Sequence, residues 1–145
     1  MAASSGKARR AEALAELVDQ ASRAVYSASY LAGLNPAQWN ALRYLNSAQA
    51  SGRTIKAFST YHRVTDSAAS QTISALARKQ LVEKHRDPAD GRAFLLELTP
   101  AGQALLAADP LQHLAAAFET LSEAELRAAG LILTAVLRKL TATQP

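Results

Sequence analysis

The sequence predicts a mostly α-helical chain with a single β-hairpin. Ala and Leu dominate its 145 residues, of which 49% are hydrophobic and only 6% aromatic, and such a composition favours helices. Apolar residues recur at helical spacing along most of the chain. The segment 81–98 differs, because two short extended runs there flank a cluster of turn residues. A chain of this length can form one domain, 1–145, with a buried core.

Composition and charge exclude several classes of protein. The chain has no cysteine, which rules out disulfides and thiolate metal sites, and no apolar run approaches the roughly 18 residues of a membrane span. The N-terminus does not resemble a secretory signal, so we expect a cytoplasmic protein. The net charge of +4 lies in 53–92, which holds eight Lys or Arg and four acidic residues. Binding to phosphate would need such a local positive field, although a solvated basic surface is the alternative.

No pattern in the sequence points to catalysis. The three histidines, His62, His85 and His113, are far apart. Metal-ligand spacings, a phosphate-binding glycine loop and a nucleophile motif are all missing from the sequence. We therefore expect no enzyme activity, no metal site and no cofactor.

A long first helix is predicted over 8–32, with Gly33 as its C-terminal cap. Small and aliphatic residues recur there at alternating spacings of three and four, which describes a seam against other helices. These residues are Ala11, Leu14, Val18, Ala21, Val25, Ala28 and Ala32. The seam belongs either to the core of the same chain or to a dimer interface.

The second helix is predicted to begin with a capping box, in which Asn35 is the N-cap, Pro36 is the first helical residue and Gln38 reaches back. We expect it to end at Gly52. Apolar residues at core spacing follow the cap: Trp39, Leu42 and Leu45. An alternative use of this helix is a small-molecule effector pocket bordered by Trp39, Arg43 and Tyr44.

The third and fourth helices are predicted over 54–62 and 65–80, joined through Arg63, Val64 and Thr65. Two helices joined by so short a turn form a helix-turn-helix, whose second helix enters the major groove of DNA. A turn of this kind often uses glycine. If Arg63 takes a positive φ there, the cost is roughly 1 kcal/mol.

The helix predicted over 65–80 has two different faces. Thr65 is the expected N-cap, and the buried face consists of Ala69, Ile73 and Leu76. The opposite face suits a DNA groove, because short side chains let the helix approach and Gln can pair with an adenine edge. It consists of Ser67, Ser70, Gln71, Ser74 and Arg78. An ordinary solvent-exposed polar face is the alternative.

The runs 81–86 and 93–98 are predicted to form the β-hairpin, with turn residues at 87–92. A hairpin directly after a recognition helix is a wing, so the predicted fold is a winged helix-turn-helix. Arg86 and Arg92 flank its tip, and a projecting Arg suits the narrow minor groove. Asp90 could hold the Arg92 guanidinium through a charge-assisted hydrogen bond. A solvated turn with an incidental salt bridge is the alternative.

The last part of the chain is predicted to be helical with one break. Thr99 and Pro100 begin a helix, and Pro110 interrupts it, with Asp109 capping a second segment through Phe118. The final helix begins with Ser122 as N-cap and Glu125 completing a capping box. Its apolar seam consists of Leu126, Gly130, Leu133, Leu137 and Leu140. Together with the N-terminal seam, it would make a helical dimerisation layer.

The order of these parts resembles the MarR family of winged helix-turn-helix transcriptional regulators. The resemblance covers nearly the whole chain and rests on four segments: 34–39 (LNPAQW), 69–76 (ASQTISAL), 87–92 (DPADGR) and 98–102 (LTPAG). It implies a homodimer that binds DNA through the fourth helix and the wing, often with relief by a small ligand. It also implies glycines in the turn and after the recognition helix, where this chain has Arg63 and Gln80. The lack of cysteine excludes the family's thiol-oxidation branch.

The sequence therefore predicts a regulator that binds double-stranded DNA sequence-specifically as a homodimer on a pseudo-palindromic operator. A ligand-responsive repressor is the expected form, with 34–99 as the DNA-binding part and with 8–33 and 100–142 as dimerisation helices. The expected DNA-binding residues are Thr65, Ser67, Ser70, Gln71, Ser74, Arg78, Arg86 and Arg92, with Asp90 as wing support. A winged-helix module that binds a protein is one alternative, and a helical protein that binds only a small molecule is another.

Overall fold

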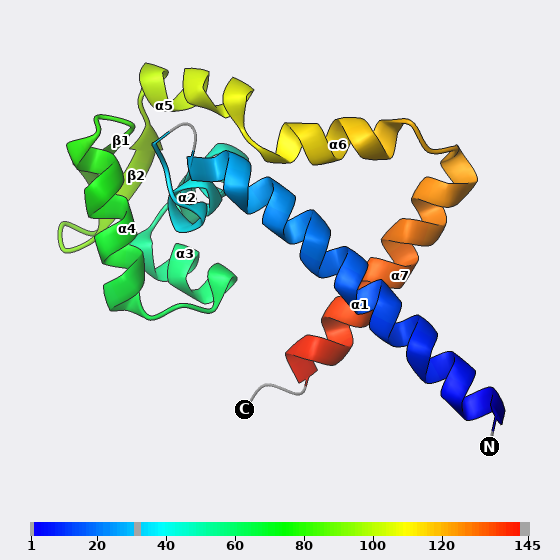
Figure 1. Cartoon of the computed structure of the whole chain (residues 1–145). Helices are drawn as coiled ribbons and strands as arrows, with labels where there is room; N and C mark the ends of the chain where they lie inside the picture. Colours follow the sequence, from blue (N-terminus) through cyan, green and yellow to red (C-terminus); the bar gives the residue numbers. More distant parts are fainter. Residues whose placement is uncertain (1, 31–32, 143–145) are drawn as a thin grey trace. The chain divides into compact units, whose positions relative to one another are not determined.

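The computed structural model describes residues 2–30 and 33–142, and in that part of the chain it contains seven α-helices and one two-stranded sheet (Figure 1). The mostly α fold with one hairpin is therefore confirmed. The chain forms two compact units, Met1–Pro110 and Leu111–Pro145. The elements in order are α1 (Ala2–Ser29), α2 (Pro36–Ser47), η2 (Ala50–Gly52), α3 (Ile55–His62), α4 (Asp66–Arg78), β1 (Val82–Arg86), β2 (Phe94–Leu98), α5 (Pro100–Leu105), η3 (Leu106–Ala108), α6 (Leu111–Glu119) and α7 (Glu123–Ala142).

Helix α1 begins earlier and ends earlier than the sequence predicted. It starts at Ala2 rather than at residue 8, because the small and polar residues before it continue the helix without a break. It ends at Ser29, and Ala32 of the predicted seam lies outside the described residues. Gly33 has a φ of +72°, and its N–H donates to the Tyr30 carbonyl at 3.1 Å, as expected of a residue that closes a helix.

Helix α2 begins with the predicted capping box. The Asn35 side chain accepts from the Gln38 N–H at 2.9 Å, and the Gln38 side chain accepts from the Asn35 N–H at 3.1 Å. The prediction that this helix ends at Gly52 is wrong, because α2 ends at Ser47. Arg53 Nε donates to the carbonyl of Ala48 at 3.0 Å. This carbonyl follows the end of α2 and has no partner within the helix, so the side chain satisfies it where the chain turns into η2.

The core of the first unit lies between α2, α4 and the hairpin. Its largest fully buried side chains include Trp39 and Leu42 from α2, Ile73 and Leu76 from α4, and Leu96 from β2. Full burial of one such aliphatic side chain stabilises the fold by roughly 1.5–3 kcal/mol. This packing fixes the inner face of α4, so the opposite face of that helix points to solvent.

Helices α3 and α4 form the predicted helix-turn-helix (Figure 1). Arg63 ends α3 in the left-handed conformation, with φ 54° and ψ 44°, so the cost of roughly 1 kcal/mol for a positive φ applies to this residue. The next residue, Val64, donates its N–H to the Ser59 carbonyl at 3.0 Å. Thr65 then caps α4 by accepting from the Ala68 N–H at 3.1 Å.

Strands β1 and β2 pair antiparallel, with Val82 opposite Leu98 and Arg86 opposite Phe94. A backbone hydrogen bond ties the hairpin to the rest of the unit, since the Leu96 N–H donates to the Arg53 carbonyl at 2.7 Å. The predicted strands are thus confirmed to within one residue at one end of each. A two-stranded hairpin is marginally stable alone, so this attachment and the buried Val82 and Leu96 hold it in place.

Helix α5 begins with the predicted Thr99 cap, whose side chain accepts from the Gly102 N–H at 3.0 Å. The predicted break also occurs, since η3 follows α5 and neither Asp109 nor Pro110 is helical. In the second unit, α7 begins with the predicted capping box, because Ser122 N–H donates to Glu125 Oε2 at 2.8 Å and Glu125 N–H donates to Ser122 Oγ at 3.3 Å.

Candidate nucleic-acid interface

The outer face of α4 is open to solvent, as predicted. Ala69, Ile73 and Leu76 are fully buried on the inner face. On the outer face, Ser67, Gln71 and Arg78 are exposed and Ser70 and Ser74 are half-buried. The face therefore presents hydroxyl, amide and guanidinium groups, and none of these five residues is acidic.

The one acid in the first turn of α4 is engaged at the junction with α3. Asp66 accepts a hydrogen bond from the Ser59 hydroxyl and forms an ion pair with Lys56 at 3.2 Å. The Ser59 hydrogen bond, and then the Lys56 ammonium, hold the pKa of Asp66 below its ordinary value. Asp66 thus stays ionised at neutral pH and links α3 to α4. Its negative charge also stabilises the N-terminus of α4, where the helix dipole is positive.

Lys84 adds a charge to the α4 face that sequence reasoning missed. Its Nζ donates to Ser74 Oγ at 3.2 Å, so an ammonium group from β1 lies beside a hydroxyl of α4. Alternation along β1 could have suggested this, because Lys84 and Arg86 share the side of the strand on which Val82 is buried. The contact itself could not be foreseen, because it joins two different elements.

The opposite side of the hairpin carries acidic groups. His85 Nε2 lies 3.3 Å from Glu83 Oε2 and 3.8 Å from Glu97 Oε2. Glu83 and Glu97 are also directly paired across the strands. The period of two along the strands therefore separates a basic side, next to α4, from an acidic side.

The two wing arginines have different surroundings. Arg86 Nη1 donates to the Gly91 carbonyl at 2.5 Å, and its guanidinium carbon lies 5.3 Å from the centre of the Phe94 ring. This side chain supports the tip of the wing while keeping its charge at the surface. Arg92 is exposed at the tip, and among the described residues it has no partner for its guanidinium.

The predicted contact between Asp90 and the Arg92 guanidinium is wrong. Asp90 Oδ1 instead accepts the backbone N–H of Arg92 at 3.0 Å. Asp87 Oδ1 accepts the Ala89 N–H at 2.8 Å in the same way. A short Asp side chain reaches a backbone N–H two residues later more easily than a mobile guanidinium, which makes these two Asx turns. Asp90 therefore shapes the loop and leaves the Arg92 side chain free to project.

The suggested effector-pocket residues each have a structural contact. Trp39 is fully buried, and its Nε1–H donates to the Ser29 carbonyl at 3.1 Å. Arg43 binds the Asp109 carboxylate through two hydrogen bonds of 2.6 and 2.8 Å. The Tyr44 hydroxyl donates to the Gly52 carbonyl at 2.7 Å. These contacts favour a structural role for all three, and the pocket stays a prediction.

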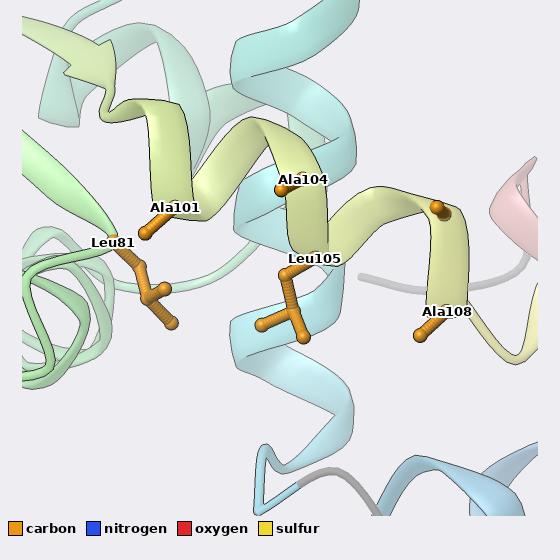
Figure 2. Close-up of a pocket in the computed structure, with 6 residues that line it drawn as sticks. Leu81, Ala101, Ala104, Leu105 and Ala108 are labelled. Carbon is orange, nitrogen blue, oxygen red and sulfur yellow. The ribbon is translucent and has the colours of Figure 1, made fainter.

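One open hollow lies beside α5 and η3 (Figure 2). All six residues that line it are aliphatic: Leu81, Ala101, Ala104, Leu105, Ala107 and Ala108. Such a lining offers apolar contact but no side-chain hydrogen bond that would orient a ligand.

No helix in the described ranges is long and apolar enough to span a membrane.

Comparison with known proteins identifies the fold. Residues 32–93 match the sequence profile of the MarR family. The structure is similar to that of a MarR family transcription regulator, with a TM-score of 0.77 and 22% identity over 96% of this chain and 93% of that chain. The fold is that of the MarR family. The resemblance noted in the sequence is thereby confirmed.

Two further similar structures are those of S. aureus MepR. One is a MepR–DNA complex, with a TM-score of 0.68 and 23% identity over 86% of this chain and 96% of that chain. The other is MepR bound to ethidium bromide, with a TM-score of 0.61 and 22% identity over 90% of this chain and 95% of that chain. No curated protein sequence matches the chain. At these identities the likeness establishes the MarR fold.

Proposed function

We propose that this chain is a transcription regulator that binds double-stranded DNA sequence-specifically. The observation that carries the proposal is the exposed face of α4. The buried residues on the other side of the helix fix its orientation, and Lys84 of β1 donates to Ser74 on the exposed face. An α-helix fits the major groove of DNA, where each base pair presents its own pattern of donors and acceptors. The MarR fold and the MepR–DNA complex that shares it support the same conclusion.

The side chains divide by chemistry into two groups. Gln71, with Ser67, Ser70 and Ser74, meets base edges or phosphates in the major groove. Thr65, at the N-terminus of α4, lies where the helix dipole favours a phosphate. Arg78 and Arg86, together with Lys84, neutralise phosphates, and Arg92 enters the minor groove. Phosphate contacts would set the register, and base contacts would set the sequence preference.

We further propose that the protein is a homodimer. Large apolar side chains remain exposed on both terminal helices, as expected of surfaces that a partner covers. On α1 they include Leu14, Leu17 and Val18, and on α7 they are Leu131, Ile132, Leu133, Val136, Leu137 and Leu140. In this proposal 34–99 binds DNA, and 8–33 and 100–142 form the dimer. Two copies of α4 would then read half-sites about 34 Å apart on a pseudo-palindromic operator.

The regulator would act in the cytoplasm as a repressor that a small ligand releases from DNA. MepR provides the support, because structures of that protein with DNA and with ethidium bromide share this fold. Linkage requires that a ligand which weakens DNA binding is itself bound less tightly by the DNA complex.

Selection of bound duplexes from a random DNA pool tests the proposed function. The purified full chain should enrich one sequence with two inverted half-sites. It should bind that duplex at least about 10³-fold more tightly than a scrambled one at ~0.15 M salt. Recovery of no preferred sequence, with equal binding of both duplexes, would reject sequence-specific regulation.

A further inference from the structure

Two residues other than glycine adopt a left-handed backbone in the described part of the chain, and they lie on either side of α4. Arg63 has a φ of +54° and precedes the helix, and Gln80 has a φ of +59° and follows it. A Cβ atom is crowded in this conformation, whereas glycine adopts it freely. Both ends of the proposed recognition helix therefore carry backbone strain that glycine would relieve.

The backbone at Arg63 needs this conformation, but the fold does not need the side chain. The N–H of Arg63 donates to the Thr60 carbonyl at 3.3 Å, and that of Val64 donates to the Ser59 carbonyl at 3.0 Å. These bonds close α3 and set the turn. Arg63 itself is exposed, and no other described residue forms a hydrogen bond or an ion pair with its guanidinium. Glycine would satisfy every contact that the structure shows at this position.

The eight cations of 53–92 divide into those that bind the protein itself and those that do not. Five of the eight donate to a group of the protein itself, namely Arg53, Lys56, Lys79, Lys84 and Arg86. Within this fully described segment the remaining three are Arg63, Arg78 and Arg92. The proposed function already places Arg78 and Arg92 at DNA. Arg63 shares their exposure and their lack of a partner.

Arg63 also lies in the part of the helix-turn-helix that is expected near the DNA backbone. It comes two residues before Thr65, the N-cap of α4. In a helix-turn-helix the N-terminal part of the second helix enters the groove, while the element before it crosses the sugar–phosphate backbone. A cation in the connecting turn would therefore lie near phosphate rather than near base edges.

We propose that the Arg63 guanidinium binds a DNA phosphate beside the groove that α4 enters. This contact is the reason that arginine occupies a strained position that glycine would fill with less strain. Strained residues concentrate where function requires them, at the expense of stability. The inference rests on the proposed DNA binding and adds one residue, together with a trade-off between folding and binding.

The test compares Arg63→Gly with two controls in the full-length protein. Arg63→Gly should raise Tm by about 3 °C, because the strain is gone. It should weaken binding to the selected operator roughly tenfold at ~0.15 M salt. For a dimer with two such contacts, the slope of log K against log salt should become shallower by about 2. Gln80→Gly removes similar strain but no charge, so Tm should rise while affinity and slope stay unchanged.

Arg63→Lys keeps the charge and should retain most of the salt slope. If the wild type shows no salt-dependent DNA binding, the proposed function and this inference both fail. If the wild type binds and Arg63→Gly binds equally well with the same slope, only the inference is overturned. Weaker binding by Arg63→Gly that comes with a lower Tm would also overturn it, because the residue would then be structural.

Discussion

Gly102 packs directly against the backbone of Leu81. A Cβ atom at position 102 would lie 2.1 Å from the Leu81 oxygen and 3.1 Å from its carbonyl carbon. The neighbouring cap joins the same segment, since Thr99 Oγ1 donates to the Gln80 carbonyl at 2.7 Å and Thr99 N–H to the Leu81 carbonyl at 3.2 Å. The start of α5 thus holds the chain at the end of α4. This contact explains the glycine of the 98–102 motif.

Gly102→Ala should therefore destabilise the first unit by about 3 kcal/mol, because backbone rather than a flexible side chain must move. Urea unfolding followed by circular dichroism measures the change. Gly91→Ala is the matched control, since a Cβ there meets nothing within 4 Å, and it should change stability by less than ~0.5 kcal/mol. Equal stability of the two variants would show that the close approach is relieved at little cost.

His62 is expected to make the fold sensitive to acid. Its Nε2 is buried without a hydrogen-bond partner among the described residues, and its ring packs on Phe58 and Tyr61 at centroid distances of 4.8 and 5.0 Å. Burial, and then the Arg43 guanidinium, hold the pKa of His62 below its ordinary value of 6.5, against a hydrogen bond with the Asn40 backbone. Protonation would place an uncompensated charge among aromatic rings, beside Arg43.

The lowered pKa of His62 sets how the free energy of unfolding depends on pH. The unfolded chain takes up a proton near pH 6.5 and the folded chain only at lower pH, so the free energy of unfolding falls as pH drops below 6.5. It should therefore be lower at pH 5 than at pH 7.5. His62→Phe should show a smaller loss over this range. An identical pH profile for both proteins would exclude His62 as the cause.

Gln71 is expected to carry sequence preference. Gln71→Ala should weaken binding to the selected operator by about 1–3 kcal/mol and leave binding to a scrambled duplex nearly unchanged, because an amide reads a base edge. Competition gel shifts with both duplexes measure the ratio. Equal losses on the two duplexes would assign Gln71 to the phosphate backbone instead.

Arg92 is expected to contribute charge and groove contact from the wing. Arg92→Ala should weaken binding and make its dependence on salt shallower by about 1 for each wing that contacts DNA. Fluorescence anisotropy at several salt concentrations measures the slope. Asp90 shapes the loop through the Arg92 N–H, so Asp90→Ala should lower affinity less. Unchanged affinity of Arg92→Ala at every salt concentration would place the wing tip away from DNA.

Local signals in the sequence were sufficient for most elements of the fold. The capping boxes of Asn35 with Gln38 and of Ser122 with Glu125 were predicted, because both partners lie within one helical turn. A positive φ at Arg63 was considered only as a condition, because such turns often use glycine, and the structure shows that conformation. Periodicity alone placed the buried and exposed faces of α4.

The features that the sequence did not reveal depend on contacts between distant segments. Arg43 pairs with Asp109, and Lys84 donates to Ser74. The partners in each pair lie too far apart in the sequence for a local motif to predict the contact. The early end of α2 depends on Arg53, and the close approach at Gly102 depends on Leu81. The candidate site was therefore predictable as a helix face with Arg78, Arg86 and Arg92, while the position of Lys84 beside Ser74 required the structure.

The most direct measurement of the central claim uses the absence of cysteine from the chain, since one introduced thiol can then be labelled without background. Gln71→Cys carrying a DNA-cleaving iron chelate should cut the selected operator inside each half-site, at positions about 10 base pairs apart. The same label at Glu123→Cys, in the first turn of α7, serves as the control. Cleavage confined to the half-sites and seen only from position 71 is the predicted result. Cleavage from position 123 with none from position 71 would contradict the assignment of the α4 face to DNA.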